Sequence, residues 1–137
     1  MTKVVLDTNV YISAIIFGGN PRQIINQAQN KTIQIFISTS ILLEIAQKLK
    51  NKFSWNTNQV KHAIKTISKT TTIVHPTINV NIVKSDPSDN KIIDCALEAK
   101  AKYIVSGDKH LLSLKKHRNI KIISPHQFLN LSPNLKN

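Results

Sequence analysis

The feature that most constrains the fold is a regular alternation of short apolar runs with longer segments whose apolar residues recur at helical spacing. The short runs, which predict strands, lie at 4–6, 33–37, 71–74, 103–105 and 120–123. Helical spacing is found at 10–16, 21–28, 41–53, 58–69, 86–99 and 111–114, and a terminal turn follows at 128–129. Strands that alternate with helices favour right-handed crossovers and a parallel sheet. We therefore predict a single-domain, three-layer α/β/α fold with a central, mostly parallel sheet.

One segment has no clear assignment. Between 76 and 85, four apolar residues alternate loosely, and this pattern is compatible with either a loop or an edge strand. The chain of 137 residues has no linker, repeat or low-complexity block, so one hydrophobic core is expected.

The charge balance is strongly positive. Nineteen Lys and Arg residues against seven Asp and Glu residues give a formal net charge of +12. Such an excess suits a polyanionic partner such as RNA or DNA. Composition drift toward Lys, Asn and Ile is the alternative explanation, but drift alone does not account for the depletion of Asp and Glu. The charge therefore favours polyanion binding.

The expected compartment is the cytoplasm. Cys95 is the single cysteine, so no intramolecular disulfide can form, which fits a reducing environment. No apolar run approaches the roughly 18 residues of a membrane span. We expect a soluble protein that does not associate with membranes.

Four of the seven acidic residues fall where predicted strands or turns lead into helices. They are Asp7, Glu44, Asp89 and Asp108. If the strands run parallel, their carboxyl ends share one edge of the sheet, and acids that are far apart in sequence meet there. The positions therefore predict a cluster of carboxylates that binds a metal ion.

A structural explanation competes with this prediction at each position. Asp7 and Asp108 precede helices, so either could be a helix N-cap. Asp89 lies within the apolar arc of its helix, where an inward carboxylate without a cation is costly, and this favours a ligand. A capping role for Asp89, three residues after a possible cap at Asp86, remains available. In the same helix, Asp94 and Glu98 are expected to be solvated surface charges. Glu44 lies about 140° from the centre of the apolar stripe of its helix, so an exposed side chain is the default expectation. A capping box does not explain it, because Ser40 as the cap would need an acid at 43, which is Leu43.

These fragments resemble the PIN-domain nucleases, and the resemblance extends from Lys3 to about Leu129. The four matching fragments are Val4-Val5-Leu6-Asp7-Thr8-Asn9, Ser40-Ile41-Leu42-Leu43-Glu44, Asp89 to Ala96, and Ser106-Gly107-Asp108. Each fragment is short, but their order and separation are fairly specific. Within the family the chain looks most like the VapC-like toxins of bacterial and archaeal toxin-antitoxin pairs. Ser106 stands where Thr is common, a departure that keeps the hydroxyl group.

The resemblance implies an activity and a set of site residues. It implies a PIN-like nuclease domain at 1–131, followed by a polar tail at 132–137, and a metal-dependent endoribonuclease that hydrolyses RNA. The implied catalytic residues and metal ligands are Asp7, Glu44, Asp89 and Asp108. Hard carboxylate oxygens suit one or two Mg²⁺ or Mn²⁺ ions, and the five histidines show no ligand spacing. Thr8, Asn9 and Ser106 are candidates for orienting the carboxylates or a phosphate.

The implied partners are an RNA substrate, a cognate antitoxin and a second copy of the chain in a homodimer. Basic rim candidates are Lys109, Lys115, Lys116 and Arg118, whereas Lys61, Lys65 and Lys69 fit an ordinary solvated helix face. Tyr11 and Trp55 could stack on bases, although aromatic residues are more often part of a core.

Three alternatives remain open. The chain could be a catalytically silent RNA-binding or antitoxin-binding module, although the presence of all four acids argues against this. It could also be an RNA-processing nuclease unrelated to toxicity. A phosphatase that forms an aspartyl-phosphate would usually have a second Asp two residues after the first, where this chain has Asn9.

Overall fold

Strands and helices alternate along the chain as the sequence predicts. The structure, a computed structural model, describes residues 1–77 and 87–131. Its elements in chain order are β1 (Thr2–Leu6), α1 (Thr8–Ile16), α2 (Gly19–Gln29), β2 (Ile33–Ser38), α3 (Thr39–Asn51), α4 (Thr57–Thr70), β3 (Thr71–Val74), α5 (Pro87–Ala99), β4 (Tyr103–Val105), α6 (Lys109–Leu114), β5 (Lys116–His117), β6 (Ile120–Ile123) and α7 (Pro125–Leu131).

The strands form one sheet in the order β3-β2-β1-β4-β6-β5, and only the short β5 pairs in an antiparallel manner. From β1 the chain winds outward through β2 to β3, and it then crosses back by way of α5 to β4 on the other side of β1. The winding direction therefore reverses between β1 and β4. In open parallel sheets, the crevice at the carboxyl ends of two such strands is the usual ligand site.

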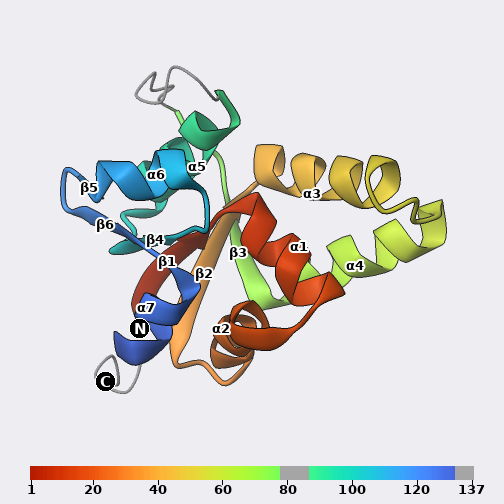
Figure 1. Ribbon diagram of the computed structural model, residues 1–137, viewed down its shortest axis with the longest axis horizontal. Helices are drawn as coiled ribbons and strands as arrows, with labels where there is room; N and C mark the ends of the chain where they lie inside the picture. The colour runs from red at the N-terminus through yellow and green to blue at the C-terminus, as the bar shows by residue number, and fades with distance from the viewer. Residues whose placement is uncertain (78–86, 132–137) are drawn as a thin grey trace.

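Helices cover both faces of the sheet, which confirms the predicted α/β class (Figure 1). The crossover helix α5 contacts β1, β2, β3 and β4. Figure 1 shows α5 and α6 on one side of the sheet and α2 and α7 on the other. On that second side, α2 packs against β2, α1, α4 and α7. The inner strands β1 and β4 are buried between these layers, and they form the centre of the core.

Local hydrogen bonds set the helix boundaries around the sheet edge. The cap of α3 is Ser38, whose side chain accepts a hydrogen bond from the Ile41 amide at 3.3 Å. Ser40, the cap considered from the sequence, is therefore wrong by two residues. Asn56 and Gln59 form a complete capping box at the start of α4.

Two features differ from the sequence analysis. Asp94, expected to be a solvated surface charge, is buried with 3% of its surface exposed. The helical pattern misplaced it because α5 contacts α3 as well as the sheet, so more than one side of α5 is covered. Glu98 is exposed as predicted, and it accepts hydrogen bonds from the Thr77 amide and hydroxyl. The strand β5 was not predicted, since two residues are too few to show a period.

Some positions considered above lie outside the described residues. They are most of the segment at 76–85, Asp86 and the polar tail at 132–137. Within the described ranges, no helix is both long enough and apolar enough to cross a membrane.

Tyr11 provides a test of the core. Its side chain is 1% exposed, so the base-stacking role is excluded, and its buried hydroxyl has no hydrogen-bond partner among the described residues. We expect Tyr11→Phe to raise the unfolding free energy by about 1 kcal/mol, because burying an unsatisfied hydroxyl is costly. Urea denaturation of both proteins checks this. A lower stability for Tyr11→Phe would mean that the hydroxyl is satisfied in solution.

Candidate functional site

Three carboxylates meet at the edge of the sheet where the winding reverses. Asp7 directly follows β1, and its amide donates a hydrogen bond to the Val105 carbonyl at the end of β4 at 2.9 Å. Asp108 follows β4 by three residues, and Asp89 lies in the first turn of α5. One carboxylate oxygen from each of the three residues lies within 4.8 Å of the others. Asp7 and Asp89 are buried, and Asp108 is partly exposed.

Ser106 links two of these acids. Its fully buried hydroxyl donates a hydrogen bond to Asp7 Oδ2 at 2.8 Å and accepts one from the Asp108 amide at 2.9 Å. The Ser106 amide in turn donates to the Ile123 carbonyl on β6. A single hydroxyl therefore orients the Asp7 carboxylate and sets the path of the backbone at Asp108.

Asp108 and Asp7 both occupy helix N-cap positions, but their side chains make different contacts there. Asp108 is the N-cap of α6, since its Oδ1 accepts a hydrogen bond from the His110 amide at 2.7 Å. It is therefore a helix cap and also a member of the carboxylate cluster. Asp7 occupies the N-cap position of α1 without a side-chain capping hydrogen bond, although the backbone of Asn9 in the first turn lowers the pKa of its carboxyl. The hydrogen bond from Ser106 shows that Asp7 also has a contact outside its own helix.

Glu44 lies beside the cluster but is not part of it. It does not belong to the three-carboxylate group, and its half-buried side chain instead accepts a hydrogen bond from the Thr8 hydroxyl at 3.0 Å. Thr8 itself is buried with 1% exposure. The structure thus brings together Asp7, Asp89 and Asp108. Glu44 lies beside this group and is hydrogen-bonded to Thr8, the residue that follows Asp7.

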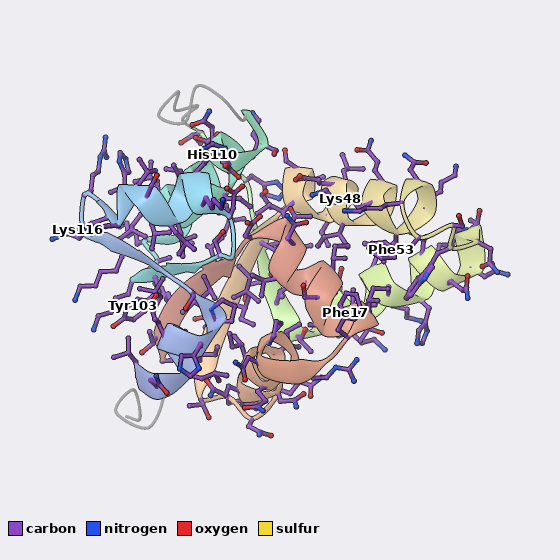
Figure 2. The ribbon with its side chains drawn as sticks, viewed as in Figure 1. Phe17, Lys48, Phe53, Tyr103, His110 and Lys116 are labelled. Atoms are coloured by element: carbon purple, nitrogen blue, oxygen red, sulfur yellow. The ribbon has the colours of Figure 1, made fainter. Side chains whose placement is uncertain are left out.

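A cation that the sequence analysis did not single out lies next to this arrangement. Lys48 donates a hydrogen bond from Nζ to Asn9 Oδ1 at 3.0 Å, so Asn9 contacts a lysine at the surface. Figure 2 shows Lys48 on the side of α3 that faces α1. The sequence could have indicated Lys48 by its position four residues after Glu44, because this spacing places both side chains on the same face of α3. Two hydrogen bonds therefore tie the start of α1 to α3.

The electrostatics of the cluster favour a cation. Burial raises the pKa of the Asp7 carboxyl above its ordinary value, and the nearby charge of Asp108 raises it further. The hydrogen bond from Ser106, the interaction with the Asn9 backbone and the charge of Lys48 oppose this rise. Three close carboxylates, two of them buried, offer hard oxygen ligands of the kind that Mg²⁺ and Mn²⁺ prefer. The residues present therefore fit a divalent cation.

The cluster opens to solvent through shallow hollows. A pocket of about 320 Å³ beside Asp108 is lined by Asn9, Val10, Ser13, Pro21, Gly107, Asp108 and Pro125. A cavity of about 430 Å³ lies elsewhere, between α1, α2 and α4, and its lining includes Trp55, Arg22 and His62. Asp108 thus reaches an open pocket, whereas Asp7 and Asp89 are buried.

Comparisons with known proteins identify relatives. Residues 3–110 match a family model described as PIN domain. The chain is 35% identical over 140 aligned residues to the uncharacterized protein MJ1680 of Methanocaldococcus jannaschii, with 93% of this chain and 89% of that protein covered.

Two solved structures share the fold. One is VapBC2 from Rickettsia felis, bound to a DNA fragment from their promoter, with a TM-score of 0.66, 16% identity, and coverage of 90% of this chain and 98% of that chain. The other is VapBC-1 from nontypeable Haemophilus influenzae, also with a TM-score of 0.66 and 16% identity, and with coverage of 91% and 99%.

The raised pKa of Asp7 gives a prediction about stability without metal. Above that pKa the folded protein holds a charge that burial disfavours, whereas below the ordinary value of 3.8 the group is protonated in both folded and unfolded protein. We therefore expect wild type to lose stability relative to Asp7→Asn as the pH rises through this window. Urea denaturation in EDTA from pH 3 to 8 measures the difference.

The matched control is Glu98→Gln, at an exposed acid outside the cluster, which we expect to stay within about 0.5 kcal/mol of wild type. Addition of Mn²⁺ at neutral pH should then stabilise wild type and Glu98→Gln but not Asp7→Asn. A lower stability for Asp7→Asn than for wild type in EDTA at neutral pH would contradict this account of Asp7.

Proposed function

This chain belongs to the PIN domain family, and on that premise we propose that it is a metal-dependent endoribonuclease. The observation that carries the proposal is the convergence of three acids from separate stretches of the chain, with oxygens within 4.8 Å of one another. The proposed reaction is hydrolysis of an RNA phosphodiester bond. The oxygen of a water molecule forms the new bond to phosphorus, and the bond to the departing sugar oxygen breaks, which leaves a 5′-phosphate and a 3′-hydroxyl.

The residues have distinct proposed roles. Asp7, Asp89 and Asp108 hold one or two Mg²⁺ or Mn²⁺ ions, and Glu44 completes the site or holds water at its edge. A bound divalent ion supplies positive charge to the phosphate and lowers the pKa of an attacking water. Ser106 keeps the Asp7 carboxylate in one orientation, and Thr8 does the same for Glu44.

The charge of the chain supports a nucleic-acid substrate. An acidic centre on a protein of net charge +12 is consistent with a polyanion that is attracted by the surrounding surface while a cation neutralises the centre. The choice of RNA over DNA rests on the resemblance to VapC-like proteins.

We also propose a protein partner, a cognate antitoxin, and assembly as a homodimer. Both structural neighbours are VapBC proteins. The cavity between α1, α2 and α4 has an apolar floor made by Ile15, Ile25 and Ile67, and such a surface suits a protein segment. Phe17, which follows α1 and is labelled in Figure 2, is a large hydrophobic side chain with 79% of its surface exposed. An RNA-processing role without an antitoxin is the competing reading.

The nuclease proposal predicts cleavage that depends on both metal and Asp108. Purified protein should cut single-stranded or structured RNA with Mn²⁺ or Mg²⁺ and not with EDTA. Asp108→Asn should lower the rate by at least about 100-fold, because it removes a charged ligand, while Asn still caps α6. Gel analysis of labelled RNA measures the rate.

The proposal fails if cleavage survives EDTA, or if Asp7→Asn and Asp108→Asn both cut RNA at the wild-type rate. Either result would point to a contaminant or to a different mechanism. Circular dichroism of each variant is the control for folding. Lys50→Gln, on an exposed part of α3, is the control for the effect of substitution itself.

The antitoxin proposal is tested by expressing the chain together with the product of the neighbouring gene. We expect the two proteins to purify as a complex in which RNA cleavage is suppressed. Cleavage at an unchanged rate in the presence of that product, with no complex on size exclusion, would favour the RNA-processing role.

A further inference from the structure

Helix α3 carries a row of functional side chains away from the carboxylates. Glu44, Lys48 and Lys52 are spaced four residues apart, so they lie along one face at steps of about 6 Å. The row begins at the hydrogen bond between Glu44 and Thr8, continues at the contact between Lys48 and Asn9, and ends at the C-cap of α3. Distance from the acidic centre therefore increases with each step along the row.

The same face of α3 is hollowed. Two shallow pockets of about 420 and 410 Å³ meet at Glu44 and Gln47, which line both of them. The first is also lined by Ser40, Ile41, Leu43, Ser88 and Lys91. The second is also lined by Lys48, Asn51 and Lys52. We call these two neighbouring hollows the α3 trough. Glu44, which lines both, is hydrogen-bonded to Thr8 next to the carboxylate cluster.

The chemistry of the trough fits an RNA strand. Lys48, Lys52 and Lys91 bring three positive charges, which suit phosphates, and the amides of Gln47 and Asn51 can both donate and accept hydrogen bonds. Lys48 also lies close enough to the centre for its charge to act on Asp7. The trough therefore offers cations for a backbone and amides for base edges next to the proposed cleavage site.

The two lysines of the row lie about 6 Å apart along the axis of α3, so both can contact the backbone of one strand. In a duplex the base edges face inward, so Gln47 and Asn51 would find no partners there, whereas unpaired bases expose these edges.

We propose that Lys48 and Lys52 of the α3 trough each contact one phosphate of the RNA segment that flanks the scissile phosphate. This inference rests on the proposed nuclease function and deepens it, since it assigns residues that position the substrate along α3. Lys48 then has two contacts, because Asn9 holds its ammonium group at the mouth of the trough.

The test measures binding separately from cleavage. Full-length protein carrying Asp108→Asn is titrated with a fluorescein-labelled, unstructured 12-nucleotide RNA and Mg²⁺, and anisotropy is recorded at several salt concentrations. Addition of Lys48→Gln should weaken binding by about five- to tenfold and reduce the slope of log Kd against log salt by about 0.7, the value for one phosphate contact on a single strand. Lys52→Gln should do the same, and Lys48→Arg should restore binding.

Lys50→Gln is the matched control, because Lys50 is an exposed lysine on α3 that does not line the trough. It should change Kd by less than about twofold. Equal losses for Lys48→Gln and Lys50→Gln would overturn the inference, as would an unchanged salt slope or tighter binding of duplex RNA. If wild type does not cleave RNA, the nuclease proposal fails. The differences in Kd among the lysine variants test the α3 trough independently of cleavage.

Discussion

The mutual repulsion of three carboxylates at one sheet edge is the constraint around which the rest of the structure is arranged. Asp7, Asp89 and Asp108 have oxygens within 4.8 Å of one another, and the burial of Asp7 and Asp89 makes the repulsion between these charges more costly. The parallel sheet imposes this proximity, because β1 and β4 are neighbours and both end at the same edge. The fold therefore maintains an arrangement that is unfavourable by itself and becomes favourable when a divalent cation binds.

The sequence was informative where one residue type recurs at equivalent positions of the fold. The burial of Asp89 followed from the apolar arc of its helix, and the ends of β1 and β4 brought Asp7 and Asp108 together. The resemblance, rather than helical periodicity, indicated Glu44. Periodicity failed for Asp94, because it assumes that one side of a helix is buried, whereas α5 is covered by both the sheet and α3.

Contacts between elements were beyond reach of the sequence. The double hydrogen bond of Ser106 depends on how the chain turns after β4, and the contact between Lys48 and Asn9 depends on how α1 and α3 pack. The contacts of Ser106 with Asp7 and of Lys48 with Asn9 join residues that are about 40 or more positions apart in the sequence. The contact of Ser106 with Asp108 follows a backbone turn that has no repeating period. The charge of Lys48 acts on Asp7, while its ammonium group is held by the amide of Asn9.

Asp108 both caps α6 and belongs to the carboxylate cluster, so the stability of this helix is linked to cation binding at the cluster. Helix α6 has six residues, too few to be stable without its cap and its packing against β6. The carboxylate that provides this cap also faces Asp7 and Asp89. A cation drawn to the three acids would restrict that carboxylate and so stiffen α6. Thermodynamic reciprocity requires the converse, so a macromolecule that fixes α6 in place would raise the affinity of the three carboxylates for a divalent cation.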